Sequence, residues 1–466
     1  MSWFRENRFF VMVFFVALAV RLVLFPGFHE VWWDSGAYVG MGKFFFSLGQ
    51  SGVWEHIRPL VWSFVLGFLW FIKLSPVFFG RVLELILGLG CIFLFYCVSD
   101  KYFGRNASIL ATVIFSFSSI LLYLNFHLYT EIPALFLVLF AVFCFEREFY
   151  SLAGFSAGLA FVTKFPAGLF LLPLLAVLFV RGELKNSFKV LAFFLIPASI
   201  FFVFNFFMYG HPLLPLIDAK LNILSVLGCN VMRAKPWWFY FAMIFRENWF
   251  HVFAPIGLFV FLKKFRFQQL LPFLCMLLPL IYFTQMHCKD YRYMMLFVPF
   301  IAMFSGSGIS ALVGKRKNLF IFILILLVGF SAFKGVWFYA DNEVIKPIPV
   351  EEDYFRFLQD KNISGEVWSS NPVVSVYSDA LIKKIYYPIY GSDSSVSFNG
   401  YLRSKGHLVH YVLLDNCGGG IICHPDDAVC ASQLNETMSF LDSNFNIVYN
   451  ETYGRCFYKV YENPLF

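Results

Sequence analysis

Long apolar segments separated by short polar ones constrain this chain more than any other feature. Of its 466 residues, 59% are hydrophobic and only 14% are charged. Several apolar segments approach or exceed the roughly 18 to 20 residues that a helix needs to cross the hydrocarbon core of a bilayer. The net charge is +7, but the lysines and arginines stand in short clusters between the apolar segments. Such clusters are typical of membrane topology, so we expect a polytopic α-helical protein embedded in a lipid bilayer, with no nucleic-acid partner.

The positive-inside rule sets the expected topology. Arg5 and Arg8 precede the first apolar segment, which lacks a small-residue cleavage site, so we expect a retained first helix and a cytoplasmic N-terminus. Residues 60–74 are apolar but short for a span, and we expect a helix in or dipping into the outer interface. Every strongly basic cluster between helices is then cytoplasmic. Eleven spans are expected, at about residues 8–25, 82–99, 107–126, 132–146, 151–164, 166–180, 190–208, 268–285, 293–312 and 318–338, with the eighth between residues 236 and 263.

The composition changes after about residue 340, where long apolar runs stop and Asp, Ser, Asn and Gly become frequent. We therefore expect a transmembrane catalytic domain at 1–340 and a small extracytoplasmic α/β domain at 341–466, which is long enough for one small domain. Alternating apolar and polar residues predict short strands there, and helical periodicity predicts two helices. The expected strands are 366–368, 384–387, 408–414, 446–449 and 456–461, and the expected helices are 351–360 and 433–443.

Four cysteines stand in this C-terminal part: Cys417, Cys423, Cys430 and Cys456. An outer location favours disulfides between them. Four cysteines allow three pairings, and the sequence does not choose among these. A zinc site is the alternative, although spacings of six and seven residues are poor for zinc.

The polar stretch 29–59 follows the first apolar segment and contains Asp34. A carboxylate held at a membrane surface is a functional candidate, while the alternative is a solvated loop acid. On the expected topology, further polar residues collect at the same outer face: Tyr38, His56, Arg58, Arg81, His127, Glu131, Lys164, His211, His287, Lys289 and Arg292. Few acids among several cations suit a reaction on an anionic, membrane-borne substrate. A carboxylate accepts a proton from an attacking hydroxyl, and Lys or Arg binds a phosphate leaving group. Snorkelling side chains and helix-end ion pairs are the alternative interpretation of the cations.

Several of these residues stand in motifs similar to those of one family. Trp33-Asp34-Ser35-Gly36-Ala37-Tyr38 resembles the Asp-Glu-Ala-x-Tyr motif in the first outer loop of the dolichyl-phosphate-mannose protein mannosyltransferase superfamily, which includes the aminoarabinose transferases and has the GT-C fold. Arg58-Pro59-Leu60 resembles its Pro-Pro-Leu stretch, and Arg81 stands where the family has an Arg opening the second helix. Other similar segments are Lys101-Tyr102-Phe103-Gly104-Arg105, Thr130-Glu131-Ile132-Pro133, Gly158-Leu159-Ala160-Phe161-Val162-Thr163-Lys164 and Arg292-Tyr293 with Pro299.

The resemblance implies a membrane glycosyltransferase, hexosyl- or mannosyl-transferase-like, with a polyprenyl (dolichyl) phosphate-linked sugar as donor and a protein, glycan or lipid as acceptor. It implies that Asp34 is the catalytic base and that Glu131 supports the site. The expected substrate-binding residues are Tyr38, His56, Arg58, Arg81, Lys164, His287, Lys289, Arg292 and Tyr293. Two departures are Ser35 in place of the second acid and Arg58 in place of a proline.

No cofactor is assigned from the sequence. Some relatives place a divalent metal near the first outer loop, and Glu55, His56 and His287 are residue types that bind one. The chain has no Asp-x-Asp motif in this stretch, so no metal ligand is assigned.

Three other functions predict different sequence features. A lipid or solute transporter or flippase would place ionisable residues in mid-helix along a pathway, whereas the expected spans are nearly free of them. An oligosaccharyltransferase would need a second acidic pair in the outer loops. A structural scaffold leaves the outer-face charges unexplained. We expect a multi-pass protein of the plasma membrane with the C-terminal domain outside, from an archaeon.

Overall fold

The structure is a computed structural model, and it describes residues 2–27, 29–225, 234–263, 270–343, 348–385, 392–417, 421, 423 and 428–466. The chain divides into two compact units. Unit 1 comprises residues 1–29, 81–213 and 235–344, and unit 2 comprises residues 30–80, 214–234 and 345–466. Each unit thus combines segments that are distant in the sequence. The expected domains, 1–340 and 341–466, stay a prediction.

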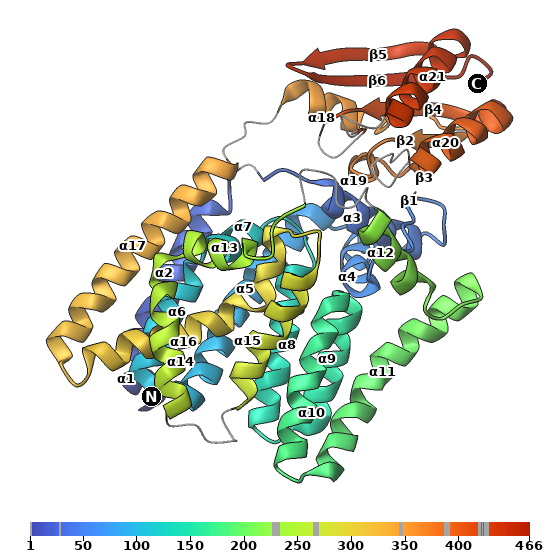
Figure 1. Cartoon of the computed structure of the whole chain (residues 1–466). Helices are drawn as coiled ribbons and strands as arrows, with labels where there is room; N and C mark the ends of the chain where they lie inside the picture. The colour runs from blue at the N-terminus through green and yellow to red at the C-terminus, as the bar shows by residue number, and fades with distance from the viewer. Residues whose placement is uncertain are drawn as a thin grey trace. The chain divides into compact units, whose positions relative to one another are not determined.

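The regular elements of unit 1 in its described residues are all helices (Figure 1). Its elements are α1 (Ser2–Glu6), α2 (Arg8–Leu24), α5 (Pro76–Phe103, with its first turn in unit 2), α6 (Arg105–Ser116), α7 (Ser119–Leu124), α8 (Glu131–Glu146), α9 (Tyr150–Thr163), η1 (Phe165–Phe170), α10 (Leu171–Val180), α11 (Leu184–Tyr209), α13 (Phe239–Glu247), η2 (Trp249–Phe253), α14 (Ala254–Lys263), α15 (Leu270–Gln285), η4 (Tyr291–Leu296), α16 (Val298–Val313) and α17 (Lys317–Glu343). These helices share one large apolar core, in which aromatic side chains such as Phe95 and Phe115 stack with ring centroids 4.6 Å apart.

Three of the described helices, α5, α11 and α17, are long and apolar enough to cross a membrane. Shorter apolar helices of 10–17 residues account for several other expected spans. The total of eleven spans stays a prediction.

Two expected spans are interrupted. Segment 107–126 divides into α6 and α7, because the Ser118 hydroxyl accepts a hydrogen bond from the Leu121 amide and caps a new helix. The expected eighth span divides into α13, η2 and α14, and there the Asn248 side chain accepts from the Phe250 amide and caps η2. Polar capping residues within an apolar run explain both interruptions.

Unit 2 contains a six-stranded sheet, with strands in the order β1-β3-β2-β4-β6-β5. The strands are β1 (Gly52–Val53), β2 (Glu366–Ser369), β3 (Leu381–Ile385), β4 (Val409–Asp415), β5 (Asn446–Tyr453) and β6 (Cys456–Glu462). The first four in spatial order are parallel, and β6 and β5 continue the sheet antiparallel. The helices are α3 (Trp33–Phe46), α4 (Leu60–Phe71), α12 (Leu214–Ser225), α18 (Pro349–Arg356), α19 (Val374–Tyr377), α20 (Ser392–Lys405), η6 (Gly406–Leu408) and α21 (Ala428–Asn444).

Alternation along β4 separates the two faces of the sheet. Tyr411 and Leu413 pack in a core with α18 and α19, whereas Val412 and Leu414 pack in a second core with α20 and α21. This two-residue period is what a strand covered on both faces requires. Figure 1 shows the strands with these helices around them.

The expected α/β character of the C-terminal part is therefore present. All five expected strands have counterparts, although β3 begins earlier than expected and residue 387 lies outside the described residues. Helix α20 and strand β1 were not expected. The stretch 29–59 was expected to be a loop, and this was wrong in one respect, because it contains α3 and β1.

Candidate active site

The Asp34 carboxylate lies in the first turn of α3, where the unpaired amides of a helix N-terminus favour negative charge. Arg58 Nη1 donates to Asp34 Oδ1 at 2.5 Å, and Arg58 Nε donates to Glu55 Oε2 at 2.6 Å. The side chains of Asp34 and Arg58 are only 16% and 14% exposed. The Arg58 guanidinium also lies over the ring of Tyr38, 5.6 Å from its centroid. We call Asp34, Tyr38, Glu55 and Arg58 the Asp34 cluster.

The Asp34 cluster unites three residues expected at the site, and it adds Glu55. One guanidinium joins two carboxylates and an aromatic face, so it fixes the orientation of the Asp34 carboxylate. A carboxylate held in one orientation at the partly exposed surface of a helix N-terminus is suited to accept a proton from a bound hydroxyl.

His56 has a different partner. Its Nε2 lies 2.8 Å from Asp218 Oδ2, with the two side chains 41% and 29% exposed. Asp218 belongs to α12 and was not identified from the sequence. It is the only acidic residue between Tyr209 and Pro236, which is a signal that was available.

A second group lies in unit 1. Lys164 Nζ donates to Glu131 Oε1 at 2.9 Å, and the two side chains are 12% and 2% exposed. Glu131 opens α8, and Lys164 stands in extended conformation between α9 and η1. The Lys164 ammonium also lies 5.5 Å from the centroid of the Tyr293 ring. We call Glu131, Lys164 and Tyr293 the Lys164 cluster.

Arg292 precedes Tyr293 in η4 and has two partners missed by sequence reasoning. Its guanidinium lies 4.9 Å from the centroid of the Tyr129 ring, and its Nε donates to Asp290 Oδ2 at 3.3 Å. Asp290 also caps η4 by accepting from the Arg292 amide at 2.9 Å. Tyr129 immediately precedes the Thr130-Glu131 motif, so the Arg292 guanidinium lies beside the segment that carries Glu131.

Arg81 contacts backbone. Its Nη2 donates to the His29 carbonyl at 2.6 Å, and its Nε donates to the Phe126 carbonyl at 3.1 Å. One turn further along α5, the buried Glu84 accepts from the Leu128 amide at 2.8 Å. Arg81 and Glu84 therefore fix the segment that leads to Glu131.

His287 and Lys289 lie between α15 and η4, and they differ in exposure. His287 is exposed, whereas Lys289 is 5% exposed and donates to the carbonyls of Lys235 and Met286. The Lys289 ammonium thus joins two segments of backbone, and its expected role toward substrate stays a prediction.

Among the residues that the structure describes, no group of three or more His, Cys, Asp or Glu side chains is arranged to hold a metal ion. Two of the residues considered for a metal have other partners, since Glu55 bonds to Arg58 and His56 to Asp218.

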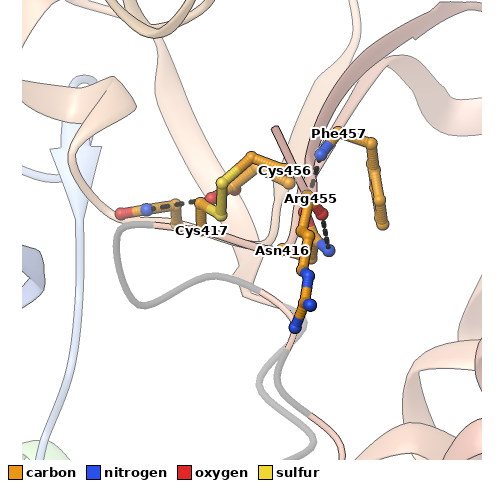
Figure 2. Close-up of a disulfide and its surroundings, with 7 residues drawn as sticks. Asn416, Cys417, Arg455, Cys456 and Phe457 are labelled. Carbon is orange, nitrogen blue, oxygen red and sulfur yellow. Dashed lines mark hydrogen bonds between the residues drawn. A yellow bond between two sulfur atoms is a disulfide. The ribbon is translucent and has the colours of Figure 1, made fainter. Parts of the chain in front are cut away.

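The four C-terminal cysteines form two disulfides, Cys417–Cys456 and Cys423–Cys430. The first joins the segment after β4 to the start of β6 (Figure 2). Asn416 supports the same junction, donating to the Arg455 carbonyl at 3.1 Å and accepting from the Phe457 amide at 2.7 Å. The structure thus selects one of the three pairings that the sequence left open.

The chain is similar to a known protein family and to solved structures. A family model described as dolichyl-phosphate-mannose-protein mannosyltransferase matches residues 58–209. That range includes Arg58, Arg81, Glu131 and Lys164. The resemblance to this superfamily is confirmed.

Solved structures agree on the fold. ArnT from Cupriavidus metallidurans bound to undecaprenyl phosphate superposes with a TM-score of 0.68 at 12% identity, covering 97% of each chain. The Archaeoglobus fulgidus oligosaccharyltransferase, tethered with an acceptor peptide containing the NVT sequon, gives a TM-score of 0.67 at 11% identity over 98% of this chain and 80% of that one. The chain has the GT-C fold.

One sequence relative is an uncharacterized protein of Aquifex aeolicus (strain VF5). It is 27% identical over 280 residues, which is 57% of this chain. The aligned region spans 64% of the relative's length.

Proposed function

We propose that the protein is a membrane glycosyltransferase that transfers a sugar from a polyprenyl (dolichyl) phosphate-linked donor to an acceptor at the outer face of the plasma membrane. In this proposal the N-terminus is cytoplasmic and the C-terminal domain lies outside. The observation that supports it most is the Asp34 carboxylate, ion-paired with Arg58 at 2.5 Å in the first turn of α3 of a GT-C fold.

The proposed reaction is a single displacement. Asp34 accepts the proton of an acceptor hydroxyl, and the hydroxyl oxygen attacks the anomeric carbon of the donor sugar. The bond from that carbon to the phosphate oxygen breaks, and polyprenyl phosphate leaves with the bonding electrons. Arg58 keeps the carboxylate in position, and Tyr38 in turn supports the guanidinium. Holding both reactants in place contributes much of the acceleration.

The leaving phosphate needs positive charge, and we assign this role to Lys164 and Arg292, with Arg81 in support. The Lys164 ammonium is already bonded to Glu131, so a phosphate oxygen would share it with that carboxylate. Glu131 then serves to orient Lys164. Fixed donors of this kind stabilise the charge that develops on a leaving group. We assign His56, His287 and Lys289 to the surrounding substrate-binding surface.

Transport is the competing function. Of the three described spans, α11 and α17 carry few ionisable residues within their apolar parts, whereas α5 carries the buried Glu84, which accepts from the Leu128 amide. Transport predicts such residues in mid-helix along a pathway. The transferase is favoured because the Asp34 and Lys164 clusters lie at helix ends, where reaction chemistry at a membrane surface is expected.

The test uses membranes that contain the wild type, Asp34→Asn or Asp360→Asn, supplied with radiolabelled polyprenyl-phosphate hexose and a cell extract as acceptor. Asp360 is an exposed acid of unit 2 and serves as the matched control. We expect label to leave the lipid with the wild type and Asp360→Asn, and at least about a hundredfold more slowly with Asp34→Asn. Equal rates for Asp34→Asn and the wild type would show that Asp34 is not the base. If the wild type consumes none of the polyprenyl-phosphate sugars, the proposed class of donor is wrong.

A further inference from the structure

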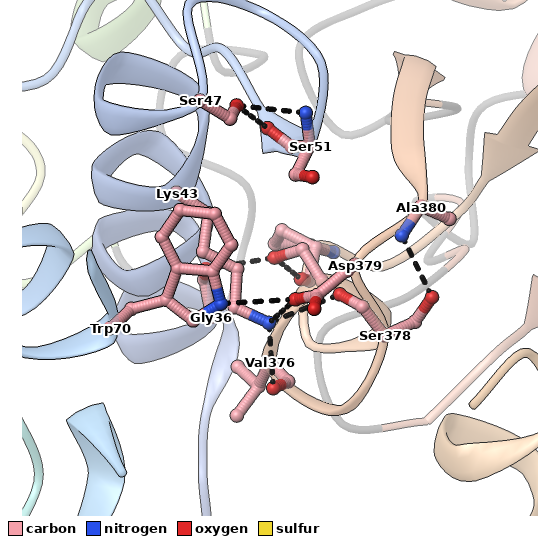
Figure 3. A network of polar contacts seen from close by, with 11 residues as sticks. Gly36, Lys43, Ser47, Ser51, Trp70, Val376, Ser378, Asp379 and Ala380 are labelled. Carbon is pink, nitrogen blue, oxygen red and sulfur yellow. Dashed lines mark hydrogen bonds and ion pairs between the residues drawn. The ribbon is translucent and has the colours of Figure 1, made fainter. Parts of the chain in front are cut away.

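Lys43 lies nine residues after Asp34 on the same helix, α3, and its ammonium is buried. Nζ donates to the Val376 carbonyl at 3.2 Å, to the Ser378 carbonyl at 3.1 Å and to Asp379 Oδ1 at 3.0 Å. An ammonium has three donors, and here each has an acceptor on one short segment that precedes β3. Figure 3 shows these contacts converging on the nitrogen. Lys43 therefore joins the helix of Asp34 to the C-terminal sheet, within unit 2.

The Lys43 ammonium is buried, so its hydrogen-bond partners must be in place. The Lys43 side chain is 4% exposed, and desolvation lowers its pKa, while Asp379 acts in the opposite direction. A buried cation is costly unless its partners are in place. Asp379 also accepts from Trp70 Nε1 at 3.1 Å, so α4 contributes to the same junction.

The start of α3 contacts the same region through small residues. The backbone of Val373 lies so close to Gly36 that an added Cβ would be 2.7 Å from the Val373 amide nitrogen. At Gly40 an added Cβ would be 2.3 Å from Ser375 Oγ. The Ser375 hydroxyl lies 3.3 Å from the Gly36 carbonyl, two residues after Asp34. Only glycine permits this approach, so a side chain at either position would force α3 away from residues 373–375.

Residues 371–373 are in turn fixed to the sheet. The Asn371 side chain accepts from the Val373 amide at 3.1 Å and donates to Asp415 Oδ2 at 3.3 Å. Asp415 ends β4, and its carboxylate also accepts from the Ser370 hydroxyl at 2.5 Å. Beyond α3, the Gly52 amide donates to the Ala380 carbonyl at 3.0 Å, where β1 pairs with β3. The helix is thus anchored to the sheet at its start, near its end and just beyond it.

We propose that Lys43 is a positioning residue, which fixes α3 on the C-terminal sheet and thereby holds Asp34 in its reactive place. This inference rests on the proposed function. It makes the C-terminal part a necessary support for the catalytic carboxylate. Lys43 touches no substrate in this account, so its loss affects turnover through the placement of Asp34. A displacement of about 1 Å at a reacting group costs up to about a hundredfold in rate.

The experiment compares Lys43→Met with Lys73→Met in the full-length protein. Both ammonium groups lie 5.9 Å from the Trp70 ring, but Lys73 is exposed, so it is a matched control. Two quantities are measured: hydrogen exchange of the α3 amides, and kcat and KM for radiolabelled polyprenyl-phosphate hexose. We expect Lys43→Met to speed exchange in α3 and to lower kcat at least about tenfold, with KM for the donor within about twofold. Lys73→Met should match the wild type in both.

Ser375→Ala is the milder second variant, for the case that Lys43→Met does not fold. It removes the hydroxyl beside the Gly36 carbonyl and should change exchange and kcat in the same direction by a smaller factor. Faster exchange in α3 with unchanged kcat would overturn the positioning role, and so would unchanged exchange. If the wild type consumes no donor, the proposed function fails and the role of Lys43 in turnover fails with it, while the exchange data still report separately whether Lys43 anchors α3.

Discussion

Replacing Lys164 by methionine tests the buried ion pair on which the Lys164 cluster depends. Two unit charges 2.9 Å apart attract by about 6 kcal/mol at an effective dielectric constant of about 20. Desolvation offsets much of that attraction, so the pair itself adds little net stability. Methionine, however, leaves the Glu131 carboxylate 2% exposed without its cation. Removing one partner of a buried pair costs about 3–5 kcal/mol. The N-terminus of α8 recovers about 0.3–1 kcal/mol, so we expect a loss of about 3 kcal/mol.

The assay is the midpoint of thermal unfolding of the purified protein in detergent, without donor. Arg105→Met is the control, because the Arg105–Glu6 pair is 3.4 Å long with side chains 47% and 60% exposed. Such an exposed pair contributes about 1 kcal/mol or less. The double variant Lys164→Met with Glu131→Gln should regain part of the lost stability, since no charge is then left buried. Equal midpoints for Lys164→Met and Arg105→Met would refute the reasoning, as would a double variant less stable than Lys164→Met.

Two further predictions concern unit 2. Loop-closure entropy favours the disulfide Cys417–Cys456, which spans 39 residues, over Cys423–Cys430, which spans 7: the expected contributions are about 4 and about 2 kcal/mol. Replacing the first pair by alanine should therefore lower the unfolding midpoint more than replacing the second, and the reverse order would contradict the loop argument. Burial raises the pKa of Glu351 from 4.5 to about 7. Between these values the folded state keeps a proton that the unfolded state releases, so stability falls as pH rises from 5 to 7.5. Glu351→Gln should reduce this fall in thermal unfolding experiments, and an unchanged pH dependence would argue against it.

Much of the fold follows from patterns in the sequence. Apolar segments near 18 residues and the alternation in β4 are strong periodic signals, and both predicted the correct type of element. Strand β1 has only two residues, Gly52 and Val53, which is too short to show any period. The interruption at Ser118 depends on one side-chain cap within an apolar run, and hydropathy does not detect it.

Motifs in the sequence named candidate residues, but they did not give the contacts between them. Motif resemblance pointed to Asp34, Glu131 and Lys164, and the structure pairs the last two. The partners Asp290 and Asp218 belong to no motif considered, and only tertiary structure brings them to Arg292 and His56. The Lys43 contacts join residues more than 330 positions apart in the sequence, a distance at which local patterns carry no information.

The central claim is that Asp34 assists a single displacement on a polyprenyl-phosphate sugar. The most direct measurement is the anomeric configuration of the product, determined by nuclear magnetic resonance from a donor of known configuration, together with the amount of polyprenyl phosphate released. A single displacement inverts the anomeric carbon and releases one polyprenyl phosphate for each sugar transferred. We predict inversion and this one-to-one release. Retention would indicate two successive displacements through a covalent intermediate and would contradict the role assigned to Asp34.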